Sequence, residues 1–599
     1  MLGAFTQVLH PAGGQAGSTL LALVPVAVLL GALALLRLSA WLAVIIGSAV
    51  TILLALVVWN VPAGDTFKSY FYGTATGAWA VAWIVFWGVV LYNTMVVTGS
   101  FERLKEWLIQ RATRDIRIQT ILLAWAFGAL LEGLVGFGYP WAVVAPILIS
   151  LGVVELDALR VSALANNAPV SFGALGAPLI GLSKVTNLNI MDLSSAVGRI
   201  VALLALAPPA ILIFLVSGWR GLRTGWPLAV AGSLGYIAGQ YPIAEFVGPY
   251  LPDIVGSLTA FATVFLLIRF WRPREVMGFG GVLLEPPEAE RAAIEPTSRE
   301  AAERVAVREQ VATVGGGGGV ALSTGGPGGP PIRRGGDGAG PQEPGRRPTP
   351  RDALFGLAPF LILIAVVVAW TGPWTKHYPP HSFWGGKSVT DYVQWQVGVS
   401  GLSASGQAID TTFKWNPFVA GSAVLCSWLL ALLILRPRLR QVPEIFKRTF
   451  SQIWGALIVA ILIFGLALLF NFSGMAASMA DGFSKVGTPY ILLAPILGWI
   501  GVALSGSNTA ANTVFGFFQL QVGRILHAPL LIFPALNSIG AEVGKPVAPQ
   551  TASVGVSTTK YVRNEGTVIR HNMPWTLVIL AYLIGIGALY YFVLPGAMR

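Results

Sequence analysis

The stretch EGLVGFGYP, Glu132 to Pro140, places one carboxylate, three glycines and one proline inside a long apolar region. Such residues do not suit a lipid-facing helix, because backbone N–H and C=O groups cannot stay unpaired in hydrocarbon. Non-helical backbone at membrane depth is tolerated where it is buried in protein or lines a water-filled cavity. The stretch therefore predicts a helix that is broken near residues 132–140 inside a membrane protein.

The composition of the whole chain supports a membrane location. Of its 599 residues, 55% are hydrophobic and 11% are charged, and the mean hydropathy is +0.69. A soluble chain carries about 25% charged residues. Apolar runs long enough to cross a bilayer recur along the chain, so we predict an all-α polytopic protein with about 12–14 transmembrane helices. It would lie in the cell membrane, in contact with lipid.

The basic residues indicate how the helices are oriented. The formal net charge is +12, and in a membrane protein such an excess belongs to cytoplasmic loops and does not imply nucleic acid as a partner. Five basic clusters can all be placed on the cytoplasmic side, which puts both termini outside. The clusters are Arg103, Lys105, Arg111, Arg114 and Arg117; Arg220 and Arg223; Arg269, Arg272 and Arg274; Arg436, Arg438, Arg440, Lys447 and Arg448; and Lys560, Arg563 and Arg570.

Two polar segments divide the chain. Residues 273–352 are rich in Gly, Pro, Arg and Glu, and they predict a disordered cytoplasmic linker. This linker would join an N-terminal transmembrane half, 1–272, to a C-terminal half, 353–599. Residues 373–415 are aromatic and partly alternating, as in VTDYVQWQVGV, and predict an external loop with a short hairpin.

A broken hairpin followed by an interrupted helix occurs once in each half. In the first half, residues 118–155 return to the cytoplasmic side with a break near 132–140, and the next segment is interrupted near 166–178. In the second half, the hairpin starts from the outer side, breaks near 505–516, and precedes a segment interrupted near 537–550. We therefore predict two halves of inverted topology with re-entrant hairpins and interrupted helices, the pattern of secondary transporters.

The four breaks predict a binding site for a small polar solute that carries a carboxylate. Each break exposes half-helix ends, and N-terminal ends offer free N–H donors and partial positive charge to an anion. For any single glycine, close helix packing is the alternative role. The predicted helix breakers are Gly136, Gly138, Pro140, Pro169, Gly173, Gly176, Pro178, Gly540, Gly544, Pro546 and Pro549. The predicted substrate-binding residues are Gly136, Gly138, Asn166, Asn167, Ser171, Ser507, Asn508, Thr509, Asn512, Asn537, Lys545 and Gln550.

Two acids in predicted membrane segments, Glu132 and Glu542, are candidates for proton coupling. A carboxyl group in a medium of low dielectric constant can exchange its proton near neutral pH. Alternatively, Glu132 pairs with a cation and holds helices together. Lys545 either pairs with Glu542 as an i,i+3 neighbour or binds the substrate carboxylate while Glu542 takes the proton. With five His, one Cys and no HExxH spacing, the chain shows no nucleophile–base set or metal cluster, so we expect no enzyme, no cofactor and no metal site.

Several of these motifs resemble the L-lactate permease family of bacterial secondary transporters. The matching pieces are GALLEGLVGFGYPWAVVAPILISLG (128–152), NNAPVSFGALGAPL (166–179), GPYLPDIVGSL (248–258), NFSGM (471–475), GWIGVALSGSNTAANTVFG (498–516) and NSIGAEVGKPVAPQTASVG (537–555). The resemblance implies an alternating-access symporter that takes up lactate, or a related 2-hydroxy monocarboxylate such as glycolate, together with protons. A sodium-coupled carboxylate carrier is the alternative, because unwound carbonyls with Ser, Thr and Asn also suit Na⁺.

The sequence departs from the family pattern at two positions. The family usually has Gly-Ser-Asp-Thr where this chain has Gly506-Ser507-Asn508-Thr509, and a small or apolar residue where this chain has Glu542. One acid is absent at one break, and another is present at the facing one. We hypothesise that Glu542 takes over a carboxylate role that Asn508 gave up. The same departures also admit an altered substrate or a different coupling ion.

Overall fold

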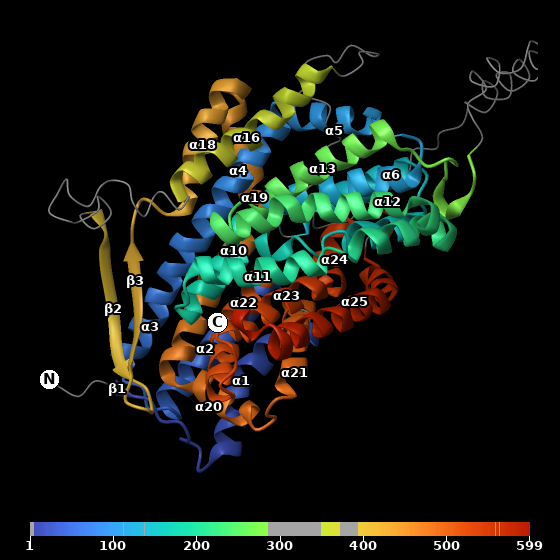
Figure 1. Cartoon of the computed structure of the whole chain (residues 1–599). Helices are drawn as coiled ribbons and strands as arrows, with labels where there is room; N and C mark the ends of the chain where they lie inside the picture. Colours follow the sequence, from blue (N-terminus) through green and yellow to red (C-terminus); the bar gives the residue numbers. More distant parts are fainter. Residues whose placement is uncertain are drawn as a thin grey trace, which may run out of the picture.

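The computed structural model describes residues 5–284, 349–371 and 393–598, apart from residues 37, 112, 137, 558 and 562. Most of the predicted linker (285–348) and the first part of the predicted external loop (373–392) lie outside the described residues. The described chain is mostly helical (Figure 1).

The first half contains helices α1 (Gln15–Ala34), α2 (Ala40–Val57), α3 (Ala63–Thr76), α4 (Trp83–Val97), α5 (Ser100–Arg111), α6 (Ile116–Gln119), α7 (Phe127–Leu134), α8 (Tyr139–Ser150), α9 (Glu155–Leu164), α10 (Gly173–Thr186), α11 (Ile190–Leu204), α12 (Pro208–Phe246) and α13 (Pro252–Phe270). The second half contains α16 (Pro350–Thr371), α18 (Ala420–Leu435), α19 (Gln441–Ser473), α20 (Met475–Ser484), α21 (Tyr490–Ser505), α22 (Asn508–Ile525), α23 (Ile532–Gly544), α24 (Pro549–Val556) and α25 (Glu565–Ala588).

The predicted class, a helical polytopic membrane protein, is confirmed. Within the described residues, nine helices are long and apolar enough to cross a membrane, and four further apolar helices are shorter. The order hairpin, then interrupted helix, also occurs twice: α7–α8 precede α9 and α10, and α21–α22 precede α23 and α24. The opposite orientation of the two halves stays a prediction.

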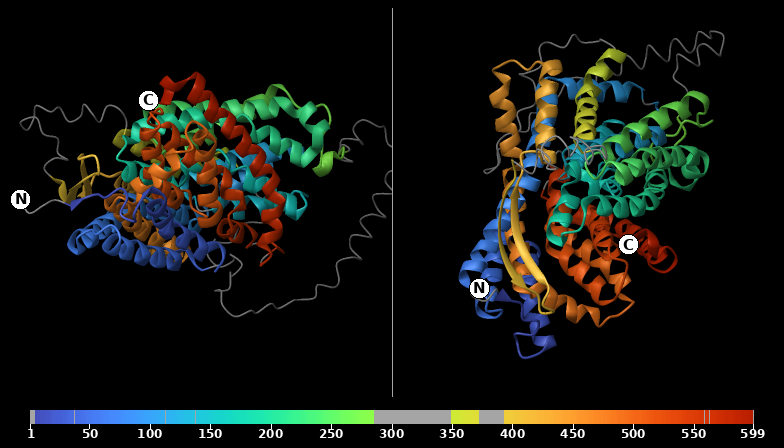
Figure 2. Two further views of the ribbon diagram at one scale, coloured as in Figure 1. Left: turned by 90° about the horizontal axis from the view of Figure 1, so that it is seen from below. Right: turned by 60° about the vertical axis from the view of Figure 1, so that its left-hand side comes forward.

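A small sheet forms beside α3. Strands β2 (Trp395–Leu402) and β3 (Ala408–Trp415) pair antiparallel, and β1 (Phe5–Thr6) joins β2 in parallel. This hairpin was predicted from the alternation in the external loop. It lies along α3 in both views (Figures 1 and 2), and the Ser69 and Thr411 hydroxyls are 3.1 Å apart.

The start of the predicted linker is ordered, which corrects the predicted boundary at residue 273. Met277 is fully buried, and its carbonyl accepts a 2.8 Å hydrogen bond from Ile116 N. Glu275 O accepts another from the buried Arg117 guanidinium. At the other end, α16 begins at Pro350, inside the predicted linker. The membrane-packed structure therefore extends into both ends of the segment that composition alone assigned to the linker.

The centre of the molecule is a pair of fully buried helices that carry polar residues. Every residue of α7 is buried, Glu132 included, and so is every residue of α23, which contains Asn537 and Glu542. Both helices are enclosed by protein, where polar side chains and broken backbone can be satisfied without contact with lipid. The four broken segments converge on this centre.

Gly540 and Gly544 are packing residues, which corrects their prediction as helix breakers. Both lie inside α23, and the interruption begins only at Lys545. A Cβ on Gly540 would lie 2.0 Å from Pro495 O of α21, and one on Gly498 of α21 would lie 2.1 Å from Asn537 O. The glycines therefore allow the backbones of α21 and α23 to touch, as small residues do between membrane helices.

We expect Gly540→Ala to lower the free energy of unfolding of the detergent-solubilised protein by about 1–3 kcal/mol, because a methyl group between two backbones forces the helices apart. The measurement is a thermal unfolding curve. Gly585→Ala in α25 is the matched control: nothing lies within 4 Å of its added Cβ, so its midpoint should stay unchanged or rise slightly. Equal midpoints for both variants would contradict the packing role.

Candidate transport site

The two broken hairpins turn at glycines. Between α7 and α8, Gly136 and Gly138 have φ values of 67° and 76°, and between α21 and α22 Gly506 has φ 71°. Residues with a side chain rarely adopt these left-handed angles, whereas glycine does so without strain. The breaks are narrower than predicted: the second is confined to Gly506 and Ser507, and residues 508–516 are already helical.

The two interrupted helices are broken in different ways. In the first half, α9 ends at Leu164, and regular helix resumes only after Gly176. On the way, Ala174 and Leu175 adopt φ 46° and 58°. Left-handed backbone costs about 1–2 kcal/mol at a residue with a side chain, and such strain gathers at functional sites. In the second half, a short 3₁₀ turn, Lys545–Val547, separates α23 from α24.

Thr551 of α24 contacts both hairpin breaks. A Cβ on Gly138 would lie 2.6 Å from its methyl group, and its hydroxyl donates to Gly506 O over 3.3 Å. The neighbouring Gln550 also lies against Gly506, at 2.8 Å from a Cβ built there. The breaks of the two halves therefore meet at one place in the protein.

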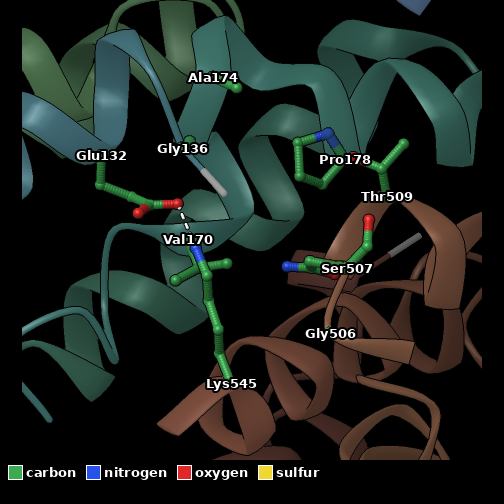
Figure 3. Close-up of a pocket in the computed structure, with 11 residues that line it drawn as sticks. Glu132, Gly136, Val170, Ala174, Pro178, Gly506, Ser507, Thr509 and Lys545 are labelled. Atoms are coloured by element: carbon green, nitrogen blue, oxygen red, sulfur yellow. Dashed lines mark hydrogen bonds and ion pairs between the residues drawn. The ribbon is translucent and has the colours of Figure 1, made fainter. Parts of the chain in front are cut away.

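A small cavity lies where these breaks meet (Figure 3). Its volume is about 30 Å³, and it is lined by Glu132, Gly136, Val170, Gly173, Ala174, Pro178, Gly506, Ser507, Asn508, Thr509 and Lys545. The first six come from the N-terminal half and the other five from the C-terminal half. The N-terminus of α22 opens onto the cavity, with Ser507 as its capping residue. Space of this size holds about one or two water molecules and must widen to admit an organic anion.

An ion pair crosses the cavity between the halves. Lys545 Nζ lies 2.5 Å from Glu132 Oε1, and the two side chains are 6% and 2% exposed. Figure 3 shows the lysine of the C-terminal half reaching toward the carboxylate of α7. Asn166 Nδ2 lies 3.5 Å from the other carboxylate oxygen. A Cβ on Gly173 would lie 2.6 Å from Glu132 Oε1, so the absence of a side chain there makes room for the carboxylate.

Of the two alternatives for Lys545, the i,i+3 pair with Glu542 is not formed, because Lys545 pairs with Glu132. Glu542 Oε2 instead accepts a 3.0 Å hydrogen bond from Ser171 N of the other half. Within the described part of the chain, its second oxygen is buried without a hydrogen-bond partner. Glu542 does not line the cavity, but Val170, the residue before Ser171, does.

A hydrogen-bond network joins the halves behind the cavity. The Ser171 and Ser538 hydroxyls are 3.2 Å apart, and Asn512 Nδ2 donates to Ser538 Oγ over 2.9 Å and to Pro178 O over 3.1 Å. Asn537 Nδ2 donates to Asn512 Oδ1 over 3.0 Å. Ser171, Asn512 and Asn537 were predicted to bind substrate, but in this conformation they bind one another or their neighbours.

The predicted site residues therefore fall into two groups. The cavity is lined by Glu132, Gly136, Ser507, Asn508, Thr509 and Lys545, whereas the others do not line it: Gly138, Asn166, Asn167, Ser171, Asn512, Asn537, Glu542 and Gln550. Among the side chains that line the cavity, Asn508 has the most unused hydrogen-bonding capacity, because both its amide atoms are buried without a partner among the residues described. In the same part of the chain, no group of three or more His, Cys, Asp or Glu is placed to hold a metal.

Sequence reasoning missed Asp253 and Tyr236 behind Glu132. Tyr236 Oη donates to Asp253 Oδ1 over 2.8 Å, and both side chains are buried. A Cβ on Gly133 would lie 2.8 Å from Asp253 Cβ, so the acid packs directly behind α7. The available signal was an acid near the start of the apolar run at residues 252–271. Thr551 was also missed, although it directly follows Gln550.

Comparison with known proteins finds relatives that match almost the whole chain. The chain is 28% identical over 597 residues to the glycolate permease GlcA of Escherichia coli (strain K12), with 97% of each chain covered. It is 28% identical over 591 residues to the L-lactate permease of Bacillus subtilis (strain 168), with 96% of each covered. Among solved structures, the Alcanivorax borkumensis YdaH transporter aligns with 96% of this chain and 99% of that one, at a TM-score of 0.43 and 13% identity.

These relatives are permeases, and with the nine apolar helices of the described residues they identify a multi-pass protein of the cell membrane. The model of the L-lactate permease family matches residues 18–307 and 349–594, which cover most of both halves and all four broken segments. The chain belongs to the L-lactate permease family.

Proposed function

We propose that this protein imports lactate, or a closely related 2-hydroxy monocarboxylate such as glycolate, by proton symport and alternating access. Family membership and the relatives named for L-lactate and glycolate support this substrate class. The observation that carries the coupling mechanism is the buried Lys545–Glu132 pair, which lines a cavity between the two halves. Each chemical feature of the substrate has a counterpart there.

The carboxylate of the substrate would bind Lys545 and the N-terminus of α22. The first N–H groups of a helix have no partner within it and carry partial positive charge, which suits an anion. The amide of Asn508 both donates and accepts, so it can bind the 2-hydroxyl group. Its two buried atoms have no partner among the described residues and would gain one from the substrate.

The proton would bind Glu132 in the cavity, and Glu542 would be the second acid needed for proton coupling. In the structure, Lys545 and Glu132 neutralise each other. When the anion arrives with a proton, Glu132 takes the proton and Lys545 changes partner, from Glu132 to the substrate. The charge in the site is zero before and after this exchange, so the loaded carrier can move without opposing the membrane potential, which acts at about 2.3 kcal/mol per charge and 100 mV.

Either event alone would be unfavourable. An anion without a proton would leave two carboxylates competing for one lysine. A proton without an anion would leave Lys545 buried and unpaired, and breaking a buried pair in this way costs about 3–5 kcal/mol. This mutual requirement is what couples the two solutes.

Alternating access requires the two halves to separate on one side at a time. The cavity of about 30 Å³ supports a closed conformation, because it is too small for a six-heavy-atom anion. Lining residues from both halves would part when it opens. We retain the proposed orientation, with both termini outside, because the five basic clusters then lie in the cytoplasm.

Uptake by proteoliposomes tests the proposal. We expect labelled lactate to accumulate when the outside is made acidic, and unlabelled glycolate to compete. Replacing Na⁺ by choline should leave uptake unchanged. Accumulation that follows a Na⁺ gradient and ignores an imposed pH gradient would instead identify the sodium-coupled alternative. Failure of both lactate and glycolate to be taken up or to compete would overturn the substrate class.

A further inference from the structure

A second cavity lies where α12, just after its kink at Gly218, meets the segment that follows the C-terminal end of α13. Its volume is about 530 Å³, within the range of about 300–1,000 Å³ found for ligand sites. It is lined by Arg220, Thr224, Trp226, Pro227, Trp271, Arg272, Arg274 and Glu275. We call this cavity the basic recess. It uses none of the residues that line the transport cavity.

The walls of the basic recess are held in place by buried contacts. The Arg117 side chain, itself fully buried, donates to Thr224 Oγ1 and to Glu275 O, each over 2.6 Å. Asp115 accepts from Arg117 at 2.6 Å and from Met277 N at 3.2 Å. The backbone of the segment after α13 is therefore fixed against α6 and α12 (Figure 1).

The basic recess has an excess of positive charge. Arg220 binds both carboxylate oxygens of Glu275 at 3.0 Å, which neutralises this pair. Arg272 and Arg274 are exposed, and neither has a carboxylate within 4 Å among the residues that the structure describes. Three arginines and one glutamate leave a charge of +2. Arg272 Nε donates to Ile268 O over 3.1 Å, which leaves its two terminal nitrogens available. Guanidinium groups bind phosphate oxygens, so Arg272 and Arg274, which have no carboxylate partner among the residues described, suit a phosphate group.

The surroundings of the basic recess indicate that this phosphate belongs to a lipid. Trp226 is 59% exposed, and Phe270, which precedes the lining residue Trp271 in the chain, is 79% exposed. Tryptophan gathers at the level of the lipid headgroups, and basic pockets at the ends of membrane helices bind anionic headgroups. We propose that the basic recess binds the phosphate of an anionic phospholipid through Arg272 and Arg274, with the acyl chains along the apolar surfaces of α12 and α13.

Lipid retention tests this site. The full-length protein is prepared in nanodiscs of phosphatidylcholine with a minority of phosphatidylglycerol, then released and analysed by native mass spectrometry. We expect bound phosphatidylglycerol in the wild type, and at least about a tenfold loss in Arg272→Gln/Arg274→Gln, because each basic residue near the surface contributes to binding an anionic lipid. The matched control is Arg438→Gln/Arg440→Gln, two exposed arginines at another basic helix end, which should retain the lipid.

Three outcomes would overturn the proposal. Equal retention of phosphatidylcholine and phosphatidylglycerol by the wild type would show that binding does not depend on the charge of the headgroup. Equal loss in both double variants would show a general effect of basic charge. Displacement of the lipid by millimolar inorganic phosphate would assign the basic recess to a soluble anion instead. Thermal unfolding of each variant in detergent shows whether it is folded, so loss of lipid by a folded protein is the supporting result.

Discussion

Lys545→Met should abolish lactate uptake and strongly destabilise the protein. The substitution leaves Glu132 in a buried place without its cation, and breaking a buried ion pair from one side costs about 3–5 kcal/mol. Uptake into proteoliposomes should fall to the level of protein-free liposomes, because the substrate carboxylate loses its cationic partner. The measurements are the initial rate of uptake and the midpoint of thermal unfolding in detergent.

The double variant Lys545→Met/Glu132→Gln separates a transport role from a structural one. It removes both charges, so most of the lost stability should return, since neutral replacements of a buried pair are often tolerated. Uptake should nevertheless remain absent. If the double variant transports lactate at a rate near that of the wild type, the pair serves only to hold the helices together. That result would restore the structural alternative for Glu132.

Lys560→Met is the matched control for the single variant. Lys560 also pairs with a glutamate, at 3.2 Å from Glu155, but its side chain is 69% exposed. An exposed ion pair contributes about 0–1 kcal/mol, so this variant should fold and transport like the wild type. The comparison distinguishes removal of a buried charge partner from removal of any lysine near the membrane.

The sequence predicted the breaks well because their causes are local. Gly136, Gly138 and Gly506 adopt backbone angles that favour glycine, and Pro546 and Pro549 frame the interruption after α23. Such requirements can be recognised within a few residues. The repeat of hairpin and interrupted helix followed from these breaks, and so did the expectation that they meet at one site.

The pairing of the charges could not be predicted in the same way. Lys545 was considered with Glu542, its neighbour in the chain, but its partner is Glu132, which is 413 residues away. A sequence gives the spacing of Glu542 and Lys545, whereas the fold decides which side chain meets which. The side chain of Lys545, which begins the 3₁₀ turn, lines the cavity, whereas Glu542 accepts a hydrogen bond from Ser171 N.

Glycines inside α23 misled the sequence analysis for a related reason. Gly540 can break a helix or allow another backbone to approach, and its own neighbours in the chain do not distinguish these roles. The decisive fact is the position of Pro495 O, 2.0 Å from where its Cβ would lie. Asp253 was missed because a helix-start acid is usually at a membrane boundary, whereas here α7 packs over it.

Glu542→Gln should uncouple transport from the pH gradient while leaving the fold intact. Glutamine keeps a carbonyl oxygen that can accept the hydrogen bond from Ser171 N, so the contact between the halves is preserved. It cannot carry a proton. If Glu542 holds the carboxylate function that the family places at the position of Asn508, lactate accumulation in acid medium should fall to the level seen without a pH gradient.

Adding Asn508→Asp to this variant makes the test sharper. An acid at position 508 lines the cavity directly and restores the usual family pattern, so proton-driven accumulation should return in Glu542→Gln/Asn508→Asp. Glu444→Gln is the matched control, since this glutamate forms an exposed pair with Arg448 and should not affect coupling. Undiminished proton-coupled uptake by Glu542→Gln would contradict the hypothesis that Glu542 takes over the carboxylate role absent at Asn508. Coupling would then depend on Glu132 alone, because it is the only acid that lines the cavity among the residues described.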